Sequence, residues 1–298
     1  MIRVRVPSTC ANLGPGFDAL GLALNLYDRF EVEAADRLVV EGCEPELSGP
    51  DNLFVRAAKR AHAELGLPLR GMRVRFDADI PVARGLGSSA ACIVGGLLAG
   101  AALATGRADA LPRDRLLDLA CELEGHPDNT TPALLGGFAV SIMDGRRVRS
   151  VRTPLGGALA FRALVPPFPL ETSKARAALP ATVPHADAVF NLGRAALLAA
   201  ALATGNVESL GAACADRLHE PYRAHLIPGF AEVVAAARDA GAIAVFLSGA
   251  GPTVMAVTRA GDDGFVRAME PALAAMKPTA WRLLDLSADD TGAVIEAG

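Results

Sequence analysis

The sequence is poor in cysteine and histidine, and neither residue type forms a pattern. The five cysteines are odd in number, far apart and free of any CxxC pair, which excludes a disulfide framework and a zinc knuckle. The five histidines show no HxxxH or HExxH spacing, so we expect no dedicated zinc site. The first 20 residues lack a charged segment followed by an apolar one, so no signal peptide is predicted. These features predict a cytoplasmic protein.

Lysine is also scarce, and the net charge is small. Only Lys59, Lys174 and Lys277 are lysines, and the formal net charge is −4. Without a basic surface field, the chain is not expected to bind nucleic acid or an anionic membrane. The most apolar run, 90–104, contains glycines at 95, 96 and 100. It is shorter than the ~18 residues that suggest a membrane span, so it predicts a buried helix. With 51% hydrophobic residues the chain is expected to be soluble and globular.

The 298 residues suffice for one large or two modest domains, and the alternation patterns predict the α+β class. Pro166-Pro167 and Pro169 follow an apolar strand and mark the predicted boundary, which gives domains 1–165 and 166–298. Asp51 is the expected N-cap of the first helix. The expected strands are 2–6, 30–40, 72–76, 138–143, 148–151, 158–165, 243–247, 253–258 and 280–286. The expected helices are 52–65, one from 88, 113–124, 171–179, 186–204, 206–217, 229–240 and 263–276.

The strongest local signal is the segment 81–91, which opens the long apolar helix. Glycines at 85 and 87 let backbone N–H groups converge, and the helix N-terminus adds about half a positive charge there. Together they make a phosphate cradle. The hydroxyls of Ser88 and Ser89 can bind phosphate oxygens or Mg²⁺. The competing interpretation is a tight strand-to-helix turn capped by a serine. A dinucleotide-binding motif fits poorly, because no strand–helix–strand array precedes the segment, and the P-loop pattern GxxxxGK[ST] does not occur.

Three further clusters contain the residue types that chemistry needs. The segment 8–18 follows the first strand with small and polar residues, and the segment 248–253 joins two apolar strands. The segment 122–129 places four ionisable side chains at a helix end, where a carboxylate can complete a magnesium site. There His126, Asp128 or Asn129 can meet an acceptor. Each cluster taken alone is also explained by an ordinary turn or a solvent-exposed loop.

These four clusters, in this order, resemble the characteristic motifs of the GHMP small-molecule kinases. The PxxxGLGSSAA and SGAGPT stretches carry the resemblance to the superfamily. Within it, the chain is most similar to the homoserine kinase family, on segments 11–18, 124–129, 172–180, 220–223 and 226–230. The resemblance implies an N-terminal domain like ribosomal protein S5 domain 2 and a C-terminal ferredoxin-like α+β domain. It also implies ATP-dependent phosphorylation of the L-homoserine hydroxyl to O-phospho-L-homoserine, a step that serves threonine biosynthesis.

The resemblance further implies a role for individual residues. Mg²⁺ would be held by Ser89 and a glutamate, with Glu122 as the predicted ligand and Glu124 as the alternative. The implied catalytic residues are His126, Asp128 and Asn129. The implied homoserine-binding residues are Asn12, Asp18, His126, Arg176 and Arg223. The implied ATP-binding residues are Asn52, near the adenine, and Pro81, Val82, Ala83, Arg84, Gly85, Leu86, Gly87, Ser88, Ser89, Ala90 and Ala91 around the phosphates.

The chemistry of these side chains suits an amino-acid substrate. An arginine fork matches a carboxylate in two hydrogen bonds, and Asp18 with Asn12 offers oxygens to an ammonium group. Two routes for the hydroxyl proton stay open: Asp128 accepts it, or the γ-phosphate does so after His126 and Asn129 position the hydroxyl. The second route is favoured. The alternative function is that of another GHMP kinase with a different alcohol acceptor, and a homodimer is compatible with the family.

Overall fold

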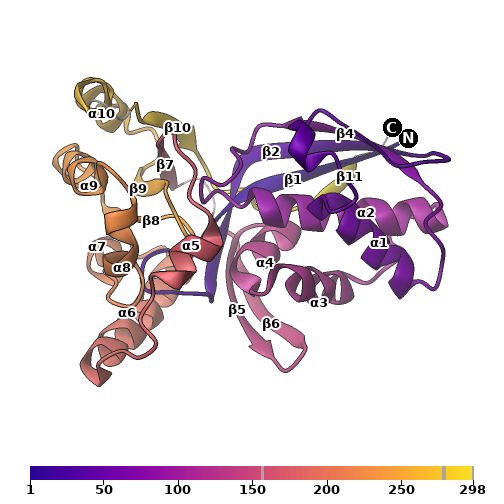
Figure 1. Cartoon of the computed structure of the whole chain (residues 1–298). Coiled ribbons are helices and arrows are strands. Elements are labelled where there is room, and N and C mark those ends of the chain that lie inside the picture. Colours follow the sequence, from indigo (N-terminus) through magenta and orange to yellow (C-terminus); the bar gives the residue numbers. More distant parts are fainter. Residues whose placement is uncertain (156–157, 277–279, 297–298) are drawn as a thin grey trace.

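The computed structural model describes residues 1–298 except 156–157, 277–279 and 297–298. The chain forms two lobes, each built on its own β-sheet (Figure 1). The first lobe contains most of the residues before 155 together with the last strand, and the second contains the residues from β7 (Leu159–Val165) to β10 (Arg282–Leu286). This two-lobed mixture of helices and mainly antiparallel sheets confirms the predicted α+β class.

The first sheet is built around two long paired strands, β1 (Ile2–Ala11) and β2 (Leu20–Ala34). Its order is β11-β1-β2-β4-β3, with β4 at Met72–Ala78, β3 at Val39–Glu41 and β11 at Val294–Glu296. The hairpin of β5 (Phe138–Asp144) and β6 (Arg147–Thr153) pairs with the start of β2. The strand predicted at 30–40 is wrong as a single element, because it spans the end of β2, a break at 35–38 and the start of β3. Strand β1 continues past Pro7 through a register shift.

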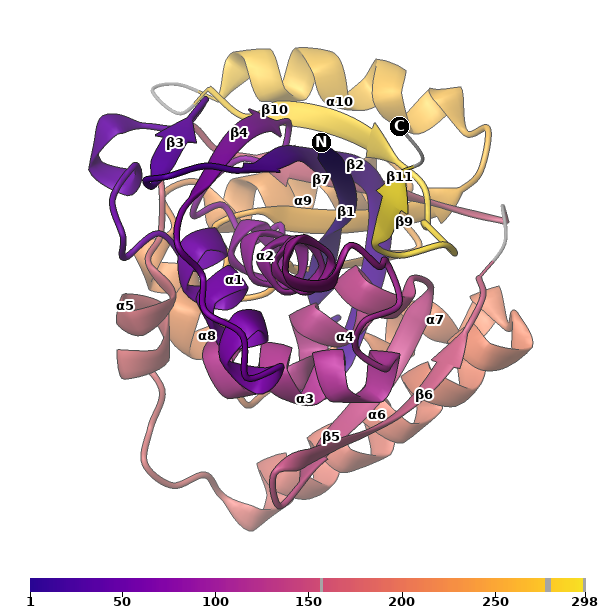
Figure 2. The same ribbon diagram turned by 90° about the vertical axis from the view of Figure 1, so that its right-hand side faces the viewer.

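Four helices cover one face of this sheet, with α2 (Ser88–Thr105) in the centre (Figure 2). The others are α1 (Leu53–Glu64), α3 (Arg113–Glu124) and α4 (Pro127–Leu135). A Cβ added to Gly96 would lie 2.3 Å from the carbonyl oxygen of Phe54, so the glycines of α2 permit the close packing of α1. The apolar run is a buried helix, as predicted. Asn52 rather than Asp51 caps α1, because its side-chain oxygen accepts from two backbone N–H groups.

The second sheet is antiparallel throughout, in the order β10-β7-β9-β8. Its strands are β7 (Leu159–Val165), β8 (Ala244–Leu247), β9 (Val254–Arg259) and β10 (Arg282–Leu286). Helices α9 (Phe230–Asp239) and α10 (Asp263–Ala275) share an apolar cluster with one face, while residues of α6 (His185–Thr204) and α7 (Leu210–Ala213) join the cluster on the other. If the four strands of this sheet are numbered 1 to 4 in chain order, from β7 to β10, their order in the sheet is 4-1-3-2. This is the ferredoxin-like order that the resemblance implied.

The chain crosses between the lobes differently from the prediction. The apolar strand assigned to the first domain, β7, pairs with β9 and β10, so the boundary at 165/166 falls after the first strand of the second sheet. The last strand, β11, returns to the first sheet beside β1. A single helix predicted at 206–217 is replaced by the 3-10 turn η2 (Val207–Ser209) and the short helix α7. Helix α8 (Glu220–Arg223) follows that region, and helix α5 (Thr172–Ala177) precedes α6 in the chain.

Two helices, α2 and α6, are long and apolar enough to cross a membrane by length and composition alone. In α2, 67% of the apolar window is buried inside the fold, as expected for the core helix of a lobe. In α6 the buried share is 22%, so most of this helix faces outward.

Candidate active site

The predicted phosphate loop lies where the first lobe meets the second, and it ends at the start of α2. Its backbone adopts left-handed φ angles of +75° at Gly85 and +76° at Gly87, a conformation that favours glycine. Gly87 is the N-cap, and no side chain in the described part of the chain caps the helix. Ser88 and Ser89 therefore lie inside the first turn instead of capping it. The first N–H groups of α2 remain free to bind an anion.

The loop is held in shape by contacts with two other predicted motifs. The Ser248 hydroxyl donates to the carbonyl of Gly85 at 2.7 Å, and the Thr9 amide donates to the carbonyl of Leu86 at 3.0 Å. A Cβ added to Gly87 would lie 1.9 Å from the Thr9 hydroxyl, and one added to Gly85 would lie 2.4 Å from the Ser248 carbonyl. The glycines of this loop are thus required both by backbone conformation and by close packing.

Arg84, also in this loop, bonds to backbone carbonyls of the chain. Its guanidinium donates to the carbonyls of Pro166 at 3.2 Å, Pro167 at 2.7 Å and Val82 at 3.0 Å. Burial lowers the pKa of this arginine. Arg84 therefore fastens the phosphate loop to the segment that follows β7, and it does so beside the cavity that the loop lines.

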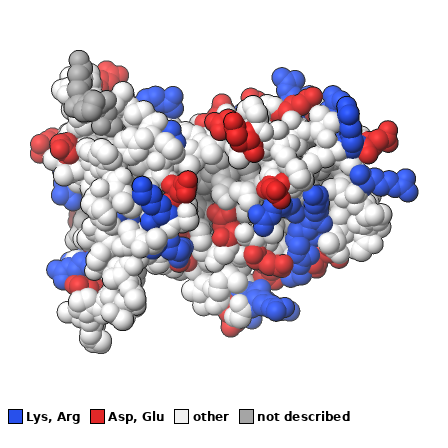
Figure 3. Space-filling model, viewed as in Figure 1, with Lys and Arg blue, Asp and Glu red and all other residues white. Residues whose placement is uncertain are grey.

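A cavity between the lobes brings the predicted clusters together, at the hollow visible near the middle of Figure 3. The wall of this cavity includes residues from the predicted phosphate loop, acceptor site and catalytic set. These are Asn12, Asp18, Ala83, Arg84, Gly85, Gly87, Ser88, Ser89, His126, Asp128, Asn129, Arg176 and Arg223. The cavity also includes residues 249–251 and Glu124. Segments more than 200 residues apart in the sequence therefore form one site.

A second cavity adjoins the first and shares Ser88 and Ser89 with it. It is lined by apolar side chains of β4 and the loops around it, and by Asn52 at the start of α1. Asn52 also donates to the carbonyl of Leu47 at 2.8 Å, which fixes the loop before the helix. Six predicted ATP-binding residues do not line the first cavity: Leu86, Ala90 and Ala91 are buried in the core, Asn52 and Val82 line the second, and the sixth is Pro81. Pro81 is half-buried and lines neither.

The glutamate chosen for Mg²⁺ is not the one that the structure places beside the phosphate loop. Glu122 forms a two-point ion pair with Arg60, at 3.1 and 3.2 Å, and its side chain is 55% exposed. Glu124 accepts a hydrogen bond from the Ser89 hydroxyl at 2.6 Å. Burial raises the pKa of Glu124, whereas the bond to Arg60 lowers the pKa of Glu122. Residues two apart on a helix point to different faces, so only one of the two can reach the loop.

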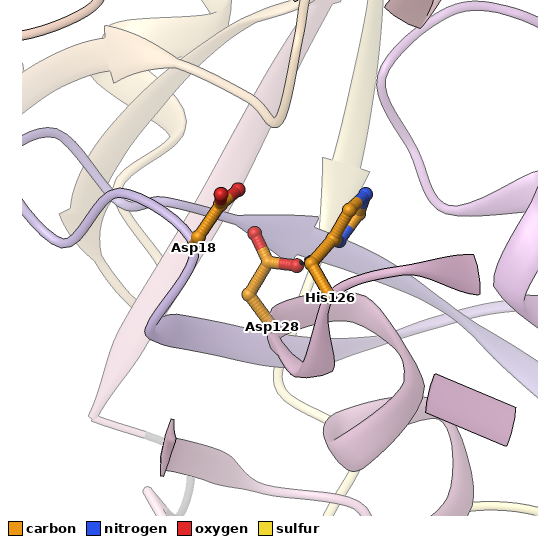
Figure 4. Close-up of side chains that lie close together, drawn as sticks. All are labelled: Asp18, His126 and Asp128. Atoms are coloured by element: carbon orange, nitrogen blue, oxygen red, sulfur yellow. Dashed lines mark hydrogen bonds and ion pairs between the residues drawn. The ribbon is translucent and has the colours of Figure 1, made fainter. Parts of the chain in front are cut away.

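His126, Asp128 and Asp18 meet on the wall of the same cavity (Figure 4). One ligand atom of each lies within 4.8 Å of those of the other two. The ring Nδ1 of His126 lies 2.5 Å from a carboxylate oxygen of Asp128, which is buried in the first turn of α4. Burial favours neutral His126, but the hydrogen bond and the charge of Asp128 outweigh it and raise the pKa of His126. The region that we expected to be a loop is helical because Pro127 suits the first helical position.

Asn129, the third predicted catalytic residue, is the next residue of α4 after Asp128. Its side-chain oxygen accepts from the Thr9 hydroxyl at 2.7 Å, which ties α4 to β1. Thr9 was not singled out from the sequence, although it lies within the polar segment 8–18. Its hydroxyl fixes Asn129 and also fills the space that a side chain at position 87 would need.

Two arginines from the second lobe complete the site around Phe17. Arg176 of α5 donates to both carboxylate oxygens of Asp18, at 2.8 and 2.9 Å. Arg223 of α8 is fully buried, and burial lowers its pKa. It donates to the carbonyls of Ala175 and Gly249, each at 3.3 Å. The two guanidinium carbons lie 5.4 and 5.2 Å from the centre of the Phe17 ring. Phe17 lies in segment 8–18 and contacts both arginines, although it is not among the residues that line the cavity.

Comparisons with known proteins agree with this geometry. The family model for the GHMP kinases N terminal domain matches residues 52–137, and the model for the GHMP kinases C terminal domain matches residues 198–270. Homoserine kinase of Clostridium botulinum is 44% identical over 296 residues, which cover 99% of this chain and 98% of that protein. Homoserine kinase of Caldicellulosiruptor bescii is 42% identical over 300 residues, with 99% and 97% covered.

A solved structure extends the agreement from sequence to fold. The crystal structure of homoserine kinase from Cytophaga hutchinsonii superposes with a TM-score of 0.86 at 28% identity, and covers 99% of this chain and 97% of that one. Both sheets and the site between them are therefore those of a shared fold. The chain belongs to the GHMP kinase family, among the homoserine kinases.

Proposed function

We propose that this protein transfers the γ-phosphoryl group of ATP to the hydroxyl of L-homoserine, giving O-phospho-L-homoserine for threonine biosynthesis. One observation carries the proposal: a single cavity joins an uncapped helix N-terminus to a cluster of two arginines and an aspartate. The first feature suits a polyphosphate, and the second suits the carboxylate and ammonium groups of an amino acid.

The nucleotide would lie across both cavities. The glycine-rich loop and the first turn of α2 offer backbone N–H groups to the phosphates, while the apolar second cavity beside Asn52 suits the adenine. The family implies Mg²⁺, and the donors present fit it, because the hydroxyl of Ser89 and the carboxylate of Glu124 are adjacent oxygen ligands. Mg²⁺ held there would offset the negative charge of the phosphates. Glu124 replaces Glu122 in this proposal.

The acceptor would lie between the lobes, on the other side of the phosphate loop. Arg176 and Arg223 suit the substrate carboxylate, and Asp18 suits the ammonium group. Asn12 acts one step further away, since its side chain accepts from the Asp18 amide at 3.0 Å and donates to the Gly249 carbonyl at 2.8 Å. It fixes the backbone that presents Asp18 to the substrate.

Phosphoryl transfer needs alignment and charge neutralisation more than a strong base. The raised pKa of His126 favours its protonated form, which cannot accept a proton but can donate a hydrogen bond. Asp128 is already bonded to that ring. We therefore propose that His126, Asp128 and Asn129 position the hydroxyl, and that a phosphate oxygen accepts its proton.

The test is an ADP-release assay with L-homoserine, mevalonate, galactose and shikimate as separate acceptors. We expect turnover with homoserine well above the rate with water alone. Turnover with one of the other alcohols instead would establish the alternative, a GHMP kinase with a different acceptor. Homoserine turnover no faster than the acceptor-free rate would refute the proposal.

We also propose that the protein is a cytoplasmic homodimer. The outer side of α6 exposes apolar side chains, and the projecting end of the second lobe carries few charges at the lower left of Figure 3. A second copy of the chain would bury this face. The exposed large side chains are Val189, Leu192 and Leu197. Light scattering after size-exclusion chromatography should show a dimer that Leu192→Glu converts to a monomer, whereas a monomeric wild type would contradict the proposal.

A further inference from the structure

The ion pair between Asp18 and Arg176 joins the two lobes inside the cavity. Both carboxylate oxygens of Asp18 accept from Arg176, and the two side chains are 34% and 43% exposed toward the cavity and solvent. Each group is therefore accessible to a ligand, yet each is satisfied by the other. A ligand that takes over the two-point hydrogen bonds of either group must separate the pair.

Asp18 is the rigid half of the pair. Its φ angle is +55°, which is unusual for a residue other than glycine, and its backbone N–H donates to Asn12. Asn12 itself has a φ of +67° and is tied to Gly249 through its side-chain amide. Backbone in this region persists only where its surroundings hold it. The backbone that carries the carboxylate of Asp18 thus keeps its place when the ion pair opens.

Arg176 is the half that can move without leaving the site. It lies on the short helix α5, and its guanidinium carbon is 5.4 Å from the Phe17 ring. Arg223 lies over the same ring at 5.2 Å but is buried and bonded to backbone carbonyls. A cation over an aromatic ring is attracted to it. Phe17 therefore retains Arg176 near the cavity after Asp18 has released it.

We propose that the Asp18–Arg176 ion pair is an exchange lock that selects a ligand carrying both an ammonium and a carboxylate group; this rests on the proposed function of the site. The ammonium takes the place of Arg176 on Asp18, and the carboxylate takes the place of Asp18 on Arg176. One ion pair becomes two, and no charge is left without a partner. The selected class is the α-amino acid as a zwitterion.

A ligand with only one of the two charges separates the ion pair and leaves one of the two side chains without a partner. A carboxylate alone leaves Asp18 unpaired, within 4.8 Å of Asp128 at the shared cluster. An ammonium alone leaves Arg176 unpaired beside Arg223, whose pKa is already lowered by burial and by the charge of Arg176. Like charges left together in a half-buried site are unfavourable. A ligand that carries only the ammonium or only the carboxylate group therefore binds with lower affinity than its own contacts would give.

This mechanism makes a prediction that independent contacts do not. Asp18→Asn removes the partner of Arg176 and so releases the guanidinium for a carboxylate ligand. We expect the variant to bind L-homoserine at least tenfold more weakly, because the ammonium loses its partner. The same variant should bind 4-hydroxybutyrate, which lacks the ammonium group, about threefold to tenfold more tightly than the wild type does.

The experiment is isothermal titration calorimetry of the wild type and variants with L-homoserine, 4-hydroxybutyrate and 3-amino-1-propanol. Arg176→Ala supplies the reciprocal arm, since it frees Asp18 and should tighten 3-amino-1-propanol. Asp187→Asn is the matched control, because Asp187 pairs with Arg217 at 3.0 Å on the surface of the second lobe, away from the residues that line the cavity. It should leave all three affinities unchanged.

Two results together would overturn the lock. Asp18→Asn would bind 4-hydroxybutyrate no more tightly than the wild type does, and Arg176→Ala would bind 3-amino-1-propanol no more tightly than the wild type does. Wild-type ADP release with homoserine separates this result from a failure of the proposed function. Turnover without tightening keeps the function and removes the lock. If the variants bind these ligands more tightly but the wild type does not turn over homoserine, the site still selects a zwitterion and homoserine is not the substrate.

Discussion

The two glutamates at the end of α3 offer a matched pair of variants, Glu124→Gln and Glu122→Gln. The substitutions are chemically identical and two residues apart, yet the side chains lie in different environments. Glu124 is bonded to Ser89 beside the phosphate loop, and Glu122 is bonded to Arg60 on the surface. We expect Glu124→Gln to lower kcat at least about 100-fold, or ~2.7 kcal/mol, through loss of a charged magnesium ligand. Glu122→Gln should leave kcat within about twofold.

The melting temperature of Glu124→Gln should stay unchanged or rise at neutral pH, although its kcat falls. Burial raises the pKa of Glu124 above its usual value of 4.5, so the folded protein disfavours the ionised side chain. Below pH 4.5 Glu124 is protonated in the folded and the unfolded chain, so it does not lower the free energy of unfolding. As the pH rises through the raised pKa, the wild type loses stability. Glutamine is never ionised, so Glu124→Gln should melt at the wild-type temperature or higher at neutral pH. The advantage should shrink as the pH falls toward 4.

Glu122→Gln should show the reverse pattern. It loses a pair with Arg60 that is partly exposed and contributes about 1 kcal/mol or less. Its melting temperature should fall slightly while its rate is retained. The assays are steady-state ADP release over a range of Mg²⁺ concentrations and thermal melts between pH 4 and 8. Equal losses of kcat in the two variants, or a Glu124→Gln enzyme with more than half the wild-type rate, would refute the assignment.

Three further predictions concern other parts of the molecule. Arg223→Ala should raise KM for homoserine roughly 10- to 100-fold and leave KM for ATP within about threefold in steady-state kinetics, and an equal rise in both would remove Arg223 from the acceptor site. Gly87→Ala should lower the free energy of unfolding by about 2 kcal/mol or more in urea titrations, because φ is +76° and the new Cβ would meet Thr9. Glu220→Gln keeps an acceptor for the Leu247 amide and removes a carboxyl whose pKa burial raises to about 8. Its melting temperature should therefore exceed that of the wild type increasingly between pH 5 and 8, and a constant difference would contradict that shift.

Sequence patterns predicted the composition of the site better than the orientation of its residues. The four motifs supply most of the cavity wall, and Asp18, His126, Asp128, Arg176 and Arg223 all line it. The sequence did not show which of the two glutamates lies beside the phosphate loop, for a simple reason. A helix pattern gives the residues that share a face, but the face that turns toward the loop depends on how α3 packs against its neighbours.

Long-range strand pairing limited the prediction of the domains in the same way. Strand 158–165 was correctly expected, but its hydrophobic pattern contains no information about which sheet it joins. Its partners are β9 and β10, which follow it by about 90 residues or more. The return of β11 to β1 pairs the two ends of the chain. Register between segments so far apart is set by the packed core, which local patterns do not encode.

The motif glycines have a meaning that the sequence alone did not give. Gly85 and Gly87 were taken as phosphate-binding residues, but the space where their side chains would lie is filled by Ser248 and Thr9. The loop is therefore shaped by packing against the other motifs before any nucleotide arrives. Since folding already fixes its N–H groups, ATP binding does not have to order them. It follows that a substitution in segment 248–253 can weaken ATP binding without touching a phosphate, through the shape of the loop at 85–87.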